Sequence, residues 1–143
     1  MATYNKFNAF VEHLAEGVHN FSSDSTCTPT VALTAAANAP VATNSVLADL
    51  TQIAYTNLSA RVITVSSSSQ TSGTYRLILV DLTLTASGGA VAAFRYVVVY
   101  NDDPTSPADP LICWFDYGAA LTLNDGESLL LDFDGTNGLF SIT

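Results

Sequence analysis

The pattern of apolar and polar positions changes its period near residue 24. Before that point, apolar side chains recur at spacings of three and four, which is typical of one face of an α-helix. These side chains are Phe7, Phe10, Val11, Leu14 and Val18. After residue 24, short runs of β-branched and aromatic residues alternate with clusters of Ser, Thr, Asn and Gly. The pattern therefore predicts one amphipathic helix over residues 4–20, followed by a β module over residues 28–143.

Both ends of the predicted helix carry residues that favour a helix boundary. Asn5 suits the N-cap, and Gly17 with Asn20 marks the end. An isolated helix of this length is marginally stable in water, so its apolar stripe must be covered. The cover is either the protein's own sheet, which is our preferred interpretation, or a neighbouring subunit.

The two histidines of the chain, His13 and His19, both fall in the predicted helix. Their spacing of six residues differs from the i, i+4 spacing of a helical metal-binding pair, and no Cys or carboxylate cluster completes a site. We therefore expect both imidazoles to be exposed to solvent.

The first part of the β module is predicted to contain a strand, a loop and one ambiguous segment. Pro29–Thr34 has the alternation of a strand. Residues 35–44, which include Pro40, read as an exposed loop or arm. Residues 45–54 fit a short helix or turn capped at position 44 or 45, and a strand is the open alternative.

The middle of the chain holds the clearest strand signals. Strands are predicted over residues 61–66, 74–85 and 91–101, with a bulge near Asp81. The Ser-rich segment 66–73 is predicted to be a loop, and Gly88–Gly89 a hairpin turn. The almost continuous apolar run Tyr96–Tyr100 predicts a strand that is buried on both faces.

The last part of the chain begins with a stiff loop over residues 102–110, which contains three prolines. Further strands are predicted over residues 111–117, 128–133 and 139–143, with a hairpin whose tip is at 124–126 and a turn at 135–138. Short strands at even spacing are typical of sandwiches. The predicted fold is therefore a single domain, 1–143: an antiparallel β-sandwich or jelly-roll-like module with one N-terminal helix.

The net charge of the chain limits the classes of binding partner that we expect. The formal net charge is -9, from 13 acidic and 4 basic residues. A surface of that sign repels nucleic-acid phosphates and anionic lipid head groups, so we expect neither partner. The chain has no apolar run long enough to span a membrane, and Glu12 and Glu16 interrupt any signal-peptide core. Cys27 and Cys113 are expected to be free, mostly buried thiols.

The acidic residues near the C-terminus offer the strongest candidates for chemistry. Residues 132–138 superficially resemble a calcium-binding loop, but Asn137 stands where the EF-hand has glycine, and Thr143 stands where it has glutamate. Asp132 and Asp134 also have the spacing of two carboxylates on one strand face, as a glycan hydrolase would need. We favour a strand edge followed by a polar turn, and predict no enzyme activity, metal or cofactor.

The aromatic run Trp114, Phe115 and Tyr117 has two interpretations. These rings could stack on sugars, but alternation along a strand turns at least one of them towards the core. We favour the core interpretation.

The sequence resembles a group of small structural proteins of tailed bacteriophages. The similarity is carried by KFNAFVEHLAEGVHNF, APVATNSVLADLTQIAYTNLSAR, SSSSQTSGTYRL, TASGGAVAAFRYVVVYND and DPLICWFDYGAALTLNDGESLLLDFDGTNGLFSI, which together span nearly the whole chain. Within that group the resemblance favours a capsid cement or decoration protein. It implies a cofactor-free homotrimer on the exterior of the virion capsid, bound to the major capsid protein and assembled in the host cytoplasm.

A cement protein needs a stiff core and arms that reach its neighbours. Candidate arms are residues 1–6, 35–44, 66–73 and 102–110. The candidate interface residues on the helix and in these arms are Phe7, Phe10, Val11, Leu14, Pro40, Pro104 and Pro107. The alternatives are a tail, neck or fibre component or a host-surface binding module, and, from a third class, a glycan hydrolase.

Overall fold

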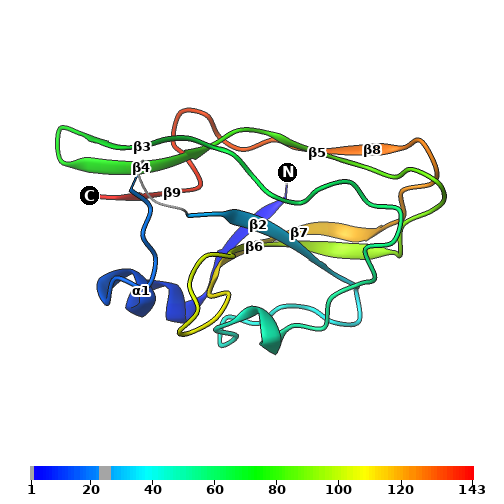
Figure 1. Ribbon diagram of the computed structural model, residues 1–143, viewed down its shortest axis with the longest axis horizontal. Helices are drawn as coiled ribbons and strands as arrows, with labels where there is room; N and C mark the ends of the chain where they lie inside the picture. The colour runs from blue at the N-terminus through cyan, green and yellow to red at the C-terminus, as the bar shows by residue number, and fades with distance from the viewer. Residues whose placement is uncertain (1, 23–26) are drawn as a thin grey trace.

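The computed structural model describes residues 2–22 and 27–143, and places nine strands, one α-helix and one short 3-10 helix there. In chain order these are β1 (Thr3–Lys6), α1 (Asn8–Ala15), β2 (Pro29–Thr34), η1 (Leu47–Asp49), β3 (Val65–Thr71), β4 (Thr74–Leu79), β5 (Leu82–Thr85), β6 (Phe94–Asn101), β7 (Leu111–Leu121), β8 (Ser128–Leu131) and β9 (Phe140–Ile142). The strands lie in two facing layers, with α1 at one end (Figure 1). The predicted β-sandwich with one helix near the N-terminus is confirmed.

The first layer is a four-stranded antiparallel sheet in the order β1-β7-β6-β2. Its central strand β6 is buried from Tyr96 to Asn101, as the apolar run predicted. Strand β2 has the predicted bounds and is buried along its whole length.

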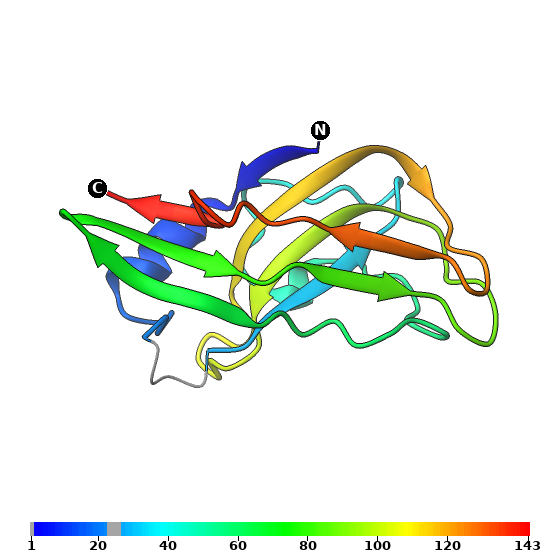
Figure 2. The same ribbon diagram turned by 90° about the horizontal axis from the view of Figure 1, so that it is seen from above.

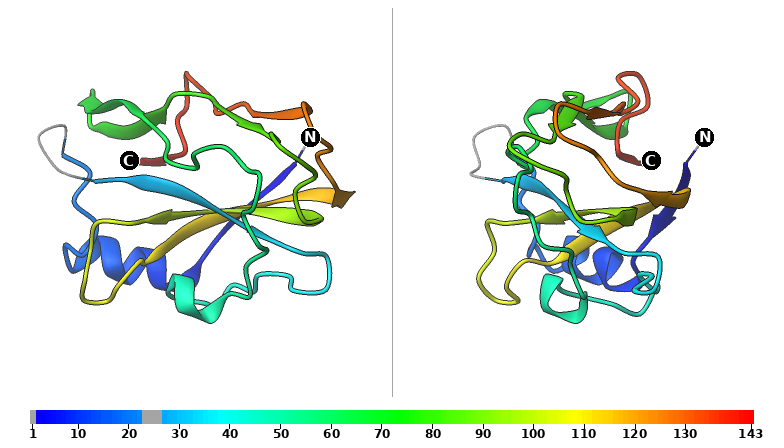
Figure 3. Two further views of the ribbon diagram at one scale, coloured as in Figure 1. Left: turned by 45° about the vertical axis from the view of Figure 1, so that its right-hand side comes forward. Right: turned by 90° about the vertical axis from the view of Figure 1, so that its right-hand side faces the viewer.

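The second layer consists of β3-β4-β9 and the separate pair β5-β8. Strand β4 leads into β5 through Val80 and Asp81, so the long strand predicted over residues 74–85 is interrupted where the sequence predicted a bulge. There the Asp81 carboxylate accepts a hydrogen bond of 2.9 Å from the backbone N–H of Phe133. This bond ties the segment after β8 to the break, and Figure 3 shows β3-β4-β9 and β5-β8 facing the first sheet.

The core lies between the layers. Its fully buried side chains come from both, including Leu33, Phe94 and Ile112 of the first layer and Leu77 and Leu84 of the second. Each such side chain contributes about 1.5–3 kcal/mol of transfer free energy on burial. The two layers are therefore held together mainly by apolar burial.

The prediction of a helix over residues 4–20 was wrong at its start. Residues 3–6 pair with β7 in antiparallel register, from Thr3 opposite Asp116 to Lys6 opposite Cys113. The N-cap of α1 is Phe7, and the Asn5 side chain instead donates a hydrogen bond to the Thr3 carbonyl. Strand pairing with β7 satisfies backbone groups of residues 3–6, which overrides the weak helical signal of that short stretch.

The predicted helix also extended too far at its end: α1 ends at Ala15, and of the two predicted end markers Gly17, not Asn20, terminates it. The φ of Gly17 is 76°, which lies in the left-handed region. The N–H of Val18 donates to the His13 carbonyl at 2.8 Å, and the N–H of Gly17 donates to that of Leu14 at 3.3 Å. This pair of bonds is a Schellman motif, which reverses the chain and which glycine adopts at low cost.

The Ser-rich segment predicted as a loop is largely strand. β3 pairs with β4 along its length, and Ser72 and Gly73 form the turn with φ values of 50° and 84°. Two positive φ values suit a type I′ hairpin, which matches the twist of the flanking strands. By contrast, the strand predicted over residues 61–66 is reduced to one bridge between Thr30 and Val62 before β3 begins.

Two predicted hairpins are instead crossings between layers. Strand β5 pairs with β8, whereas β6 pairs with β2 and β7, so Gly88–Gly89 links the two layers. The turn at residues 124–127 exists, but it joins β7 and β8 in different layers. Turn residues mark where a strand ends, and do not determine which strand it pairs with.

The ambiguous segment 45–54 contains the 3-10 helix η1, as its first interpretation predicted. Its N-cap is Val46, and the Asp49 carboxylate accepts bonds from the N–H groups of Ser45 and Val46. These bonds lower the pKa of Asp49. None of the helices in the described ranges has the length and apolar character that would let it cross a membrane.

Candidate protein-binding face: the open side of the sandwich

On one long side of the sandwich, the chain itself covers the edge of β2. We call residues 51–64 the strap, because they run along the outer edge of β2. The N–H of Ile53 donates to the Leu33 carbonyl at 3.0 Å, and the N–H of Ile63 donates to the Pro29 carbonyl at 2.8 Å. Val31 in turn donates its N–H to the carbonyl of Arg61 at 2.9 Å. The edge of β2 is therefore largely satisfied within the protein.

Two side chains fasten the strap. The hydroxyl of Tyr55 accepts the N–H of Leu33 at 3.0 Å and donates to the amide oxygen of Gln52 at 2.6 Å. The guanidinium of Arg61 lies 3.7 Å from the centre of the Tyr55 ring and donates to the Val31 carbonyl. Burial, the largest cause, raises the pKa of Tyr55, so its hydroxyl stays protonated and can donate.

The opposite side of the sandwich is open. Among the described residues, β1 pairs only with β7, β8 only with β5, and β9 only with β4. Each of these three strands therefore has one edge without a partner strand. Strand β7 also continues beyond its pairing with β1, from Tyr117 to Leu121.

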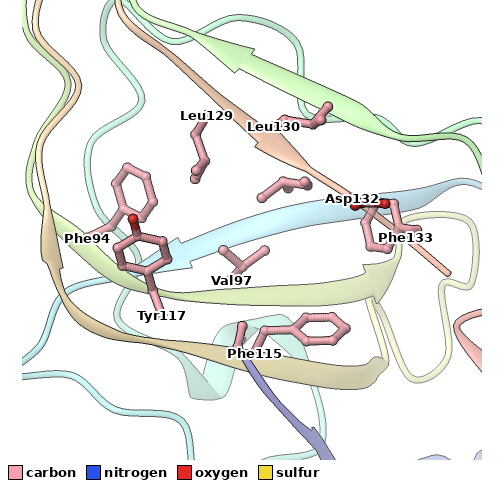
Figure 4. Close-up of a pocket in the computed structure, with 10 residues that line it drawn as sticks. Phe94, Val97, Phe115, Tyr117, Leu129, Leu130, Asp132 and Phe133 are labelled. Atoms are coloured by element: carbon pink, nitrogen blue, oxygen red, sulfur yellow. The ribbon is translucent and has the colours of Figure 1, made fainter.

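An apolar furrow follows this open side between the two layers. At one end, β7 and β8 enclose a hollow of about 510 Å³ (Figure 4). It is lined by Ala2, Phe94, Val97, Phe115, Tyr117, Leu129, Leu130, Leu131, Asp132 and Phe133. A second hollow of about 510 Å³ lies at the other end between α1, β1 and β9. A third, of about 370 Å³, shares Tyr4 and Leu139 with the second, and shares Phe115 and Phe133 with the first.

Exposed apolar side chains concentrate along this furrow. The structure has eight exposed large hydrophobic side chains in its described part, and five of them line the furrow. They are Tyr4, Val11, Tyr117, Leu130 and Ile142, with exposed fractions from 42% to 56%. A continuous apolar surface beside unpaired strand edges is typical of a protein-contact site. The open side is therefore the candidate functional face.

Few charged groups interrupt the furrow. Lys6 lines one end, and Asp132 and Asp134 line the middle. The Asp134 carboxylate accepts three hydrogen bonds of 2.8 Å, from the backbone of Thr136 and from the backbone and side chain of Asn137. The bonds from Asn137 lower the pKa of Asp134 most, and the bond from Thr136 adds to them.

Asp134 thus caps its own turn, and the predicted polar turn after the strand is present. Within residues 2–22 and 27–143, no three Asp, Glu, His or Cys side chains lie close enough together to bind a metal ion.

The aromatic residues of β7 divide between core and furrow. Trp114 is half-buried and its ring lies 4.5 Å from that of Phe7. Phe115 is half-buried and contacts Tyr4 at a ring distance of 5.6 Å. Tyr117 is 52% exposed. The core interpretation therefore fits Trp114 best and does not fit Tyr117.

The candidate interface residues are not equally accessible. Phe7 and Phe10 are only 0% and 3% exposed, so the protein's own residues cover them, as our preferred interpretation of the stripe predicted. Pro40 is also buried, although residues 36–39 of its loop are exposed as predicted. These three side chains are not available to a partner.

The remaining candidates keep some accessible surface. Val11 is exposed and Leu14 half-buried, and both line the furrow. Pro104 and Pro107 are half-buried in the loop between β6 and β7. Tyr4 lies in the candidate arm 1–6 but was not singled out, and sequence reasoning missed Leu130 and Ile142, because only the pairing of strands shows which edges stay open.

The expectation of exposed histidines was wrong. His13 is 8% exposed and His19 only 5%. The Schellman turn at Gly17 carries His19 back against the helix, where the two imidazole centres lie 5.9 Å apart. If the helix continued to residue 20, the side chains of His13 and His19 would point in different directions around the helix axis.

The cysteines are free thiols, as expected. Cys113 is fully buried in β7, and Cys27 is partly buried. Burial, with a smaller effect of Asp103, raises the pKa of Cys27 to about 12, and burial also raises the pKa of Cys113 far above its usual range. Neither thiol therefore has the thiolate character of a nucleophile.

Comparisons with known proteins add no relative: no family model, curated protein or solved structure matches the chain.

Proposed function

We propose that this protein is a structural virion protein that binds and stabilises the assembled capsid of a tailed bacteriophage, and that it does so through the open side of its sandwich. The observation that carries the proposal is the furrow itself, where five exposed apolar side chains lie beside three strands with an unpaired edge. Burying this apolar face against a second protein is favourable, because it removes apolar surface from water. The resemblance to phage structural proteins supplies the setting.

The physics of a cement protein fits this face. A repeated shell offers the same site many times, and a protein that contacts several neighbouring subunits gains avidity well beyond its single-site affinity. The strap side and the fully paired centre of the sheet provide a stiff body, and the furrow provides the contact. A homotrimer is the assembly we propose, with the major capsid protein as partner and the capsid exterior as location.

Copy number in purified virions of the encoding phage tests the proposal. Quantitative mass spectrometry should find this chain in a fixed ratio to the major capsid protein, and sedimentation equilibrium of the free protein should give the mass of three chains. A few copies per particle would instead assign it to the tail, neck or fibre and would overturn the cement role.

Surface variants test the contact face. Leu130→Asp places a carboxylate in the furrow at a side chain that is 56% exposed. It should abolish binding to particles that lack this protein, while circular dichroism and the thermal midpoint stay unchanged. Val62→Asp is the matched control, because Val62 is 52% exposed but lies in the strap. Equal loss of binding in both variants would show that the furrow is not the contact.

A further inference from the structure

The end of α1 places two imidazoles in an aromatic cluster. We define the cluster as Phe10, His13, His19, Phe21 and Phe140. The His19 ring stacks on Phe21 with centres 5.2 Å apart and an interplanar angle of 8°, and it lies 5.2 Å from the ring of Phe10. Phe140 of β9 contacts Phe10 at 5.0 Å and Phe21 at 5.3 Å. The cluster is therefore the contact that joins α1 to β9, and Figure 2 shows these elements side by side.

The imidazoles enter this cluster without hydrogen bonds to stabilise a charge. Within the part of the chain that the structure describes, the buried Nδ1 of His13 and both ring nitrogens of His19 have no hydrogen-bond partner. Both side chains are more than nine-tenths buried. A neutral imidazole tolerates this environment, but an imidazolium does not, because its charge would lose water and gain no acceptor.

The surrounding groups offer the imidazolium little compensation. On α1, Glu12 and Glu16 are exposed, and neither forms an ion pair with a histidine. From β4, the neighbouring titratable group is Tyr75, whose hydroxyl shares a 2.7 Å hydrogen bond with Ser68 of β3 and whose pKa is raised mainly by burial.

The remaining neighbours add no compensating charge. From β9, the cluster receives the apolar ring of Phe140. Burial raises the pKa of Cys27 to about 12, so this thiol is uncharged.

We propose that His19, packed beside His13 in this cluster, is an acid-sensitive latch, which holds the α1 segment on the sandwich while its imidazole is neutral and releases it when that imidazole takes up a proton. Release separates Phe10 and Phe21 from Phe140 and opens the end of the furrow that α1 borders. The latch is independent of which partner the furrow binds, so failure of capsid binding leaves it intact.

The sign of the pH dependence follows from burial. Burial, and secondarily the charge of His13, lowers the pKa of His19 from its ordinary 6.5 to about 4. Between these values the unfolded or released segment binds a proton that the latched form excludes, so the latched form loses stability as pH falls through this window. The equilibrium constant for latching should fall by roughly 300-fold in total, because the two pKa values differ by about 2.5.

The first test uses the intact wild-type protein. The chain has only two histidines, so its imidazole Cε1–H signals can be followed individually by NMR. One signal should titrate with a midpoint near 4, and backbone amides of residues 8–22 should lose hydrogen-exchange protection at a higher pH than those of β6. If no imidazole signal titrates near 4, or if α1 and β6 lose protection together, the latch is overturned.

The second test replaces His19, the residue that takes up the proton. His19→Phe keeps a planar ring on Phe21 and cannot be protonated, so α1 should stay protected down to the pH at which β6 opens. His13→Gln is the matched control and should keep the acid-dependent release. Equal acid release in wild type and His19→Phe would overturn the proposal. If added Zn²⁺ controls the release and a chelator reverses that effect, the two histidines form a metal-binding pair. That result would also overturn the acid-sensitive latch.

Discussion

The two long sides of the sandwich handle their strand edges in opposite ways. On the closed side, the strap bonds to the edge of β2, and the Tyr55 hydroxyl satisfies the Leu33 N–H. On the open side, β1, β8 and β9 each pair along one edge only, and apolar side chains line the furrow between them. Within residues 2–22 and 27–143, the chain therefore covers the first sheet's edge at β2 and leaves its other edge, at β1, without a partner strand, while in the second layer β3 and β9 each pair with β4 alone. The difference indicates where a partner is expected.

The largest predicted effect on stability concerns the core beneath the strap. Leu33→Ala removes a side chain that is 0% exposed, so it should lower the free energy of unfolding by about 2–5 kcal/mol in urea denaturation. Leu130→Ala, on the open side, is the matched control and should change it by less than about 0.5 kcal/mol. A cost at Leu130 as large as that at Leu33 would mean that the furrow belongs to the monomer's core.

The next effect concerns the turn that brings β9 to the open side. A Cβ at Gly138 would lie 2.4 Å from the Leu77 carbonyl oxygen, and the residue has a φ of 79°. Gly138→Ala should cost about 2–3 kcal/mol of unfolding free energy, from strain plus displacement of β9. Gly126→Ala has a similar φ of 85° but open space around its Cβ, so it should cost only about 1 kcal/mol. Equal thermal midpoints for the two variants would contradict the close approach of β9 to β4.

The smallest effect concerns one hydrogen bond of the strap. Tyr55→Phe leaves the Leu33 N–H without its acceptor, so the free energy of unfolding should fall by about 1 kcal/mol. Tyr117→Phe, which removes an exposed hydroxyl from the furrow, should be neutral when measured by the same urea titration. A neutral Tyr55→Phe would show that the backbone bonds alone fasten the strap.

Much of the fold could be predicted, because its signals are local. The alternation in Pro29–Thr34, the apolar run of β6 and the glycine at the end of α1 each follow from a few neighbouring residues. The Ser-rich strand β3 could not be predicted, because its stability comes from pairing with β4 across a type I′ turn and not from apolar side chains. Residues 3–6 were misassigned for the same reason: their partner, β7, lies more than a hundred residues away.

The candidate face was only partly visible in the sequence. Val11 and Leu14 stood out because they belong to the apolar stripe of the helix, and they do line the furrow. Phe10 stood out for the same reason but is buried against Phe140, which comes from the other end of the chain. An apolar stripe in the sequence indicates that its side chains must be buried, but it does not show which part of the protein, or which partner, buries them.

By itself, the sequence determined the β-rich class, the single helix and its glycine end, because period, propensity and backbone freedom act over a few residues. Only the tertiary structure decided that the sandwich closes along β2 and stays open along β1, β8 and β9, because edge pairing depends on segments far apart in the chain. The same is true of the buried histidines, since the chain reversal and the ring of Phe140 together create the apolar cluster around them. Local chemistry specified the elements, and long-range packing specified the surfaces they leave exposed.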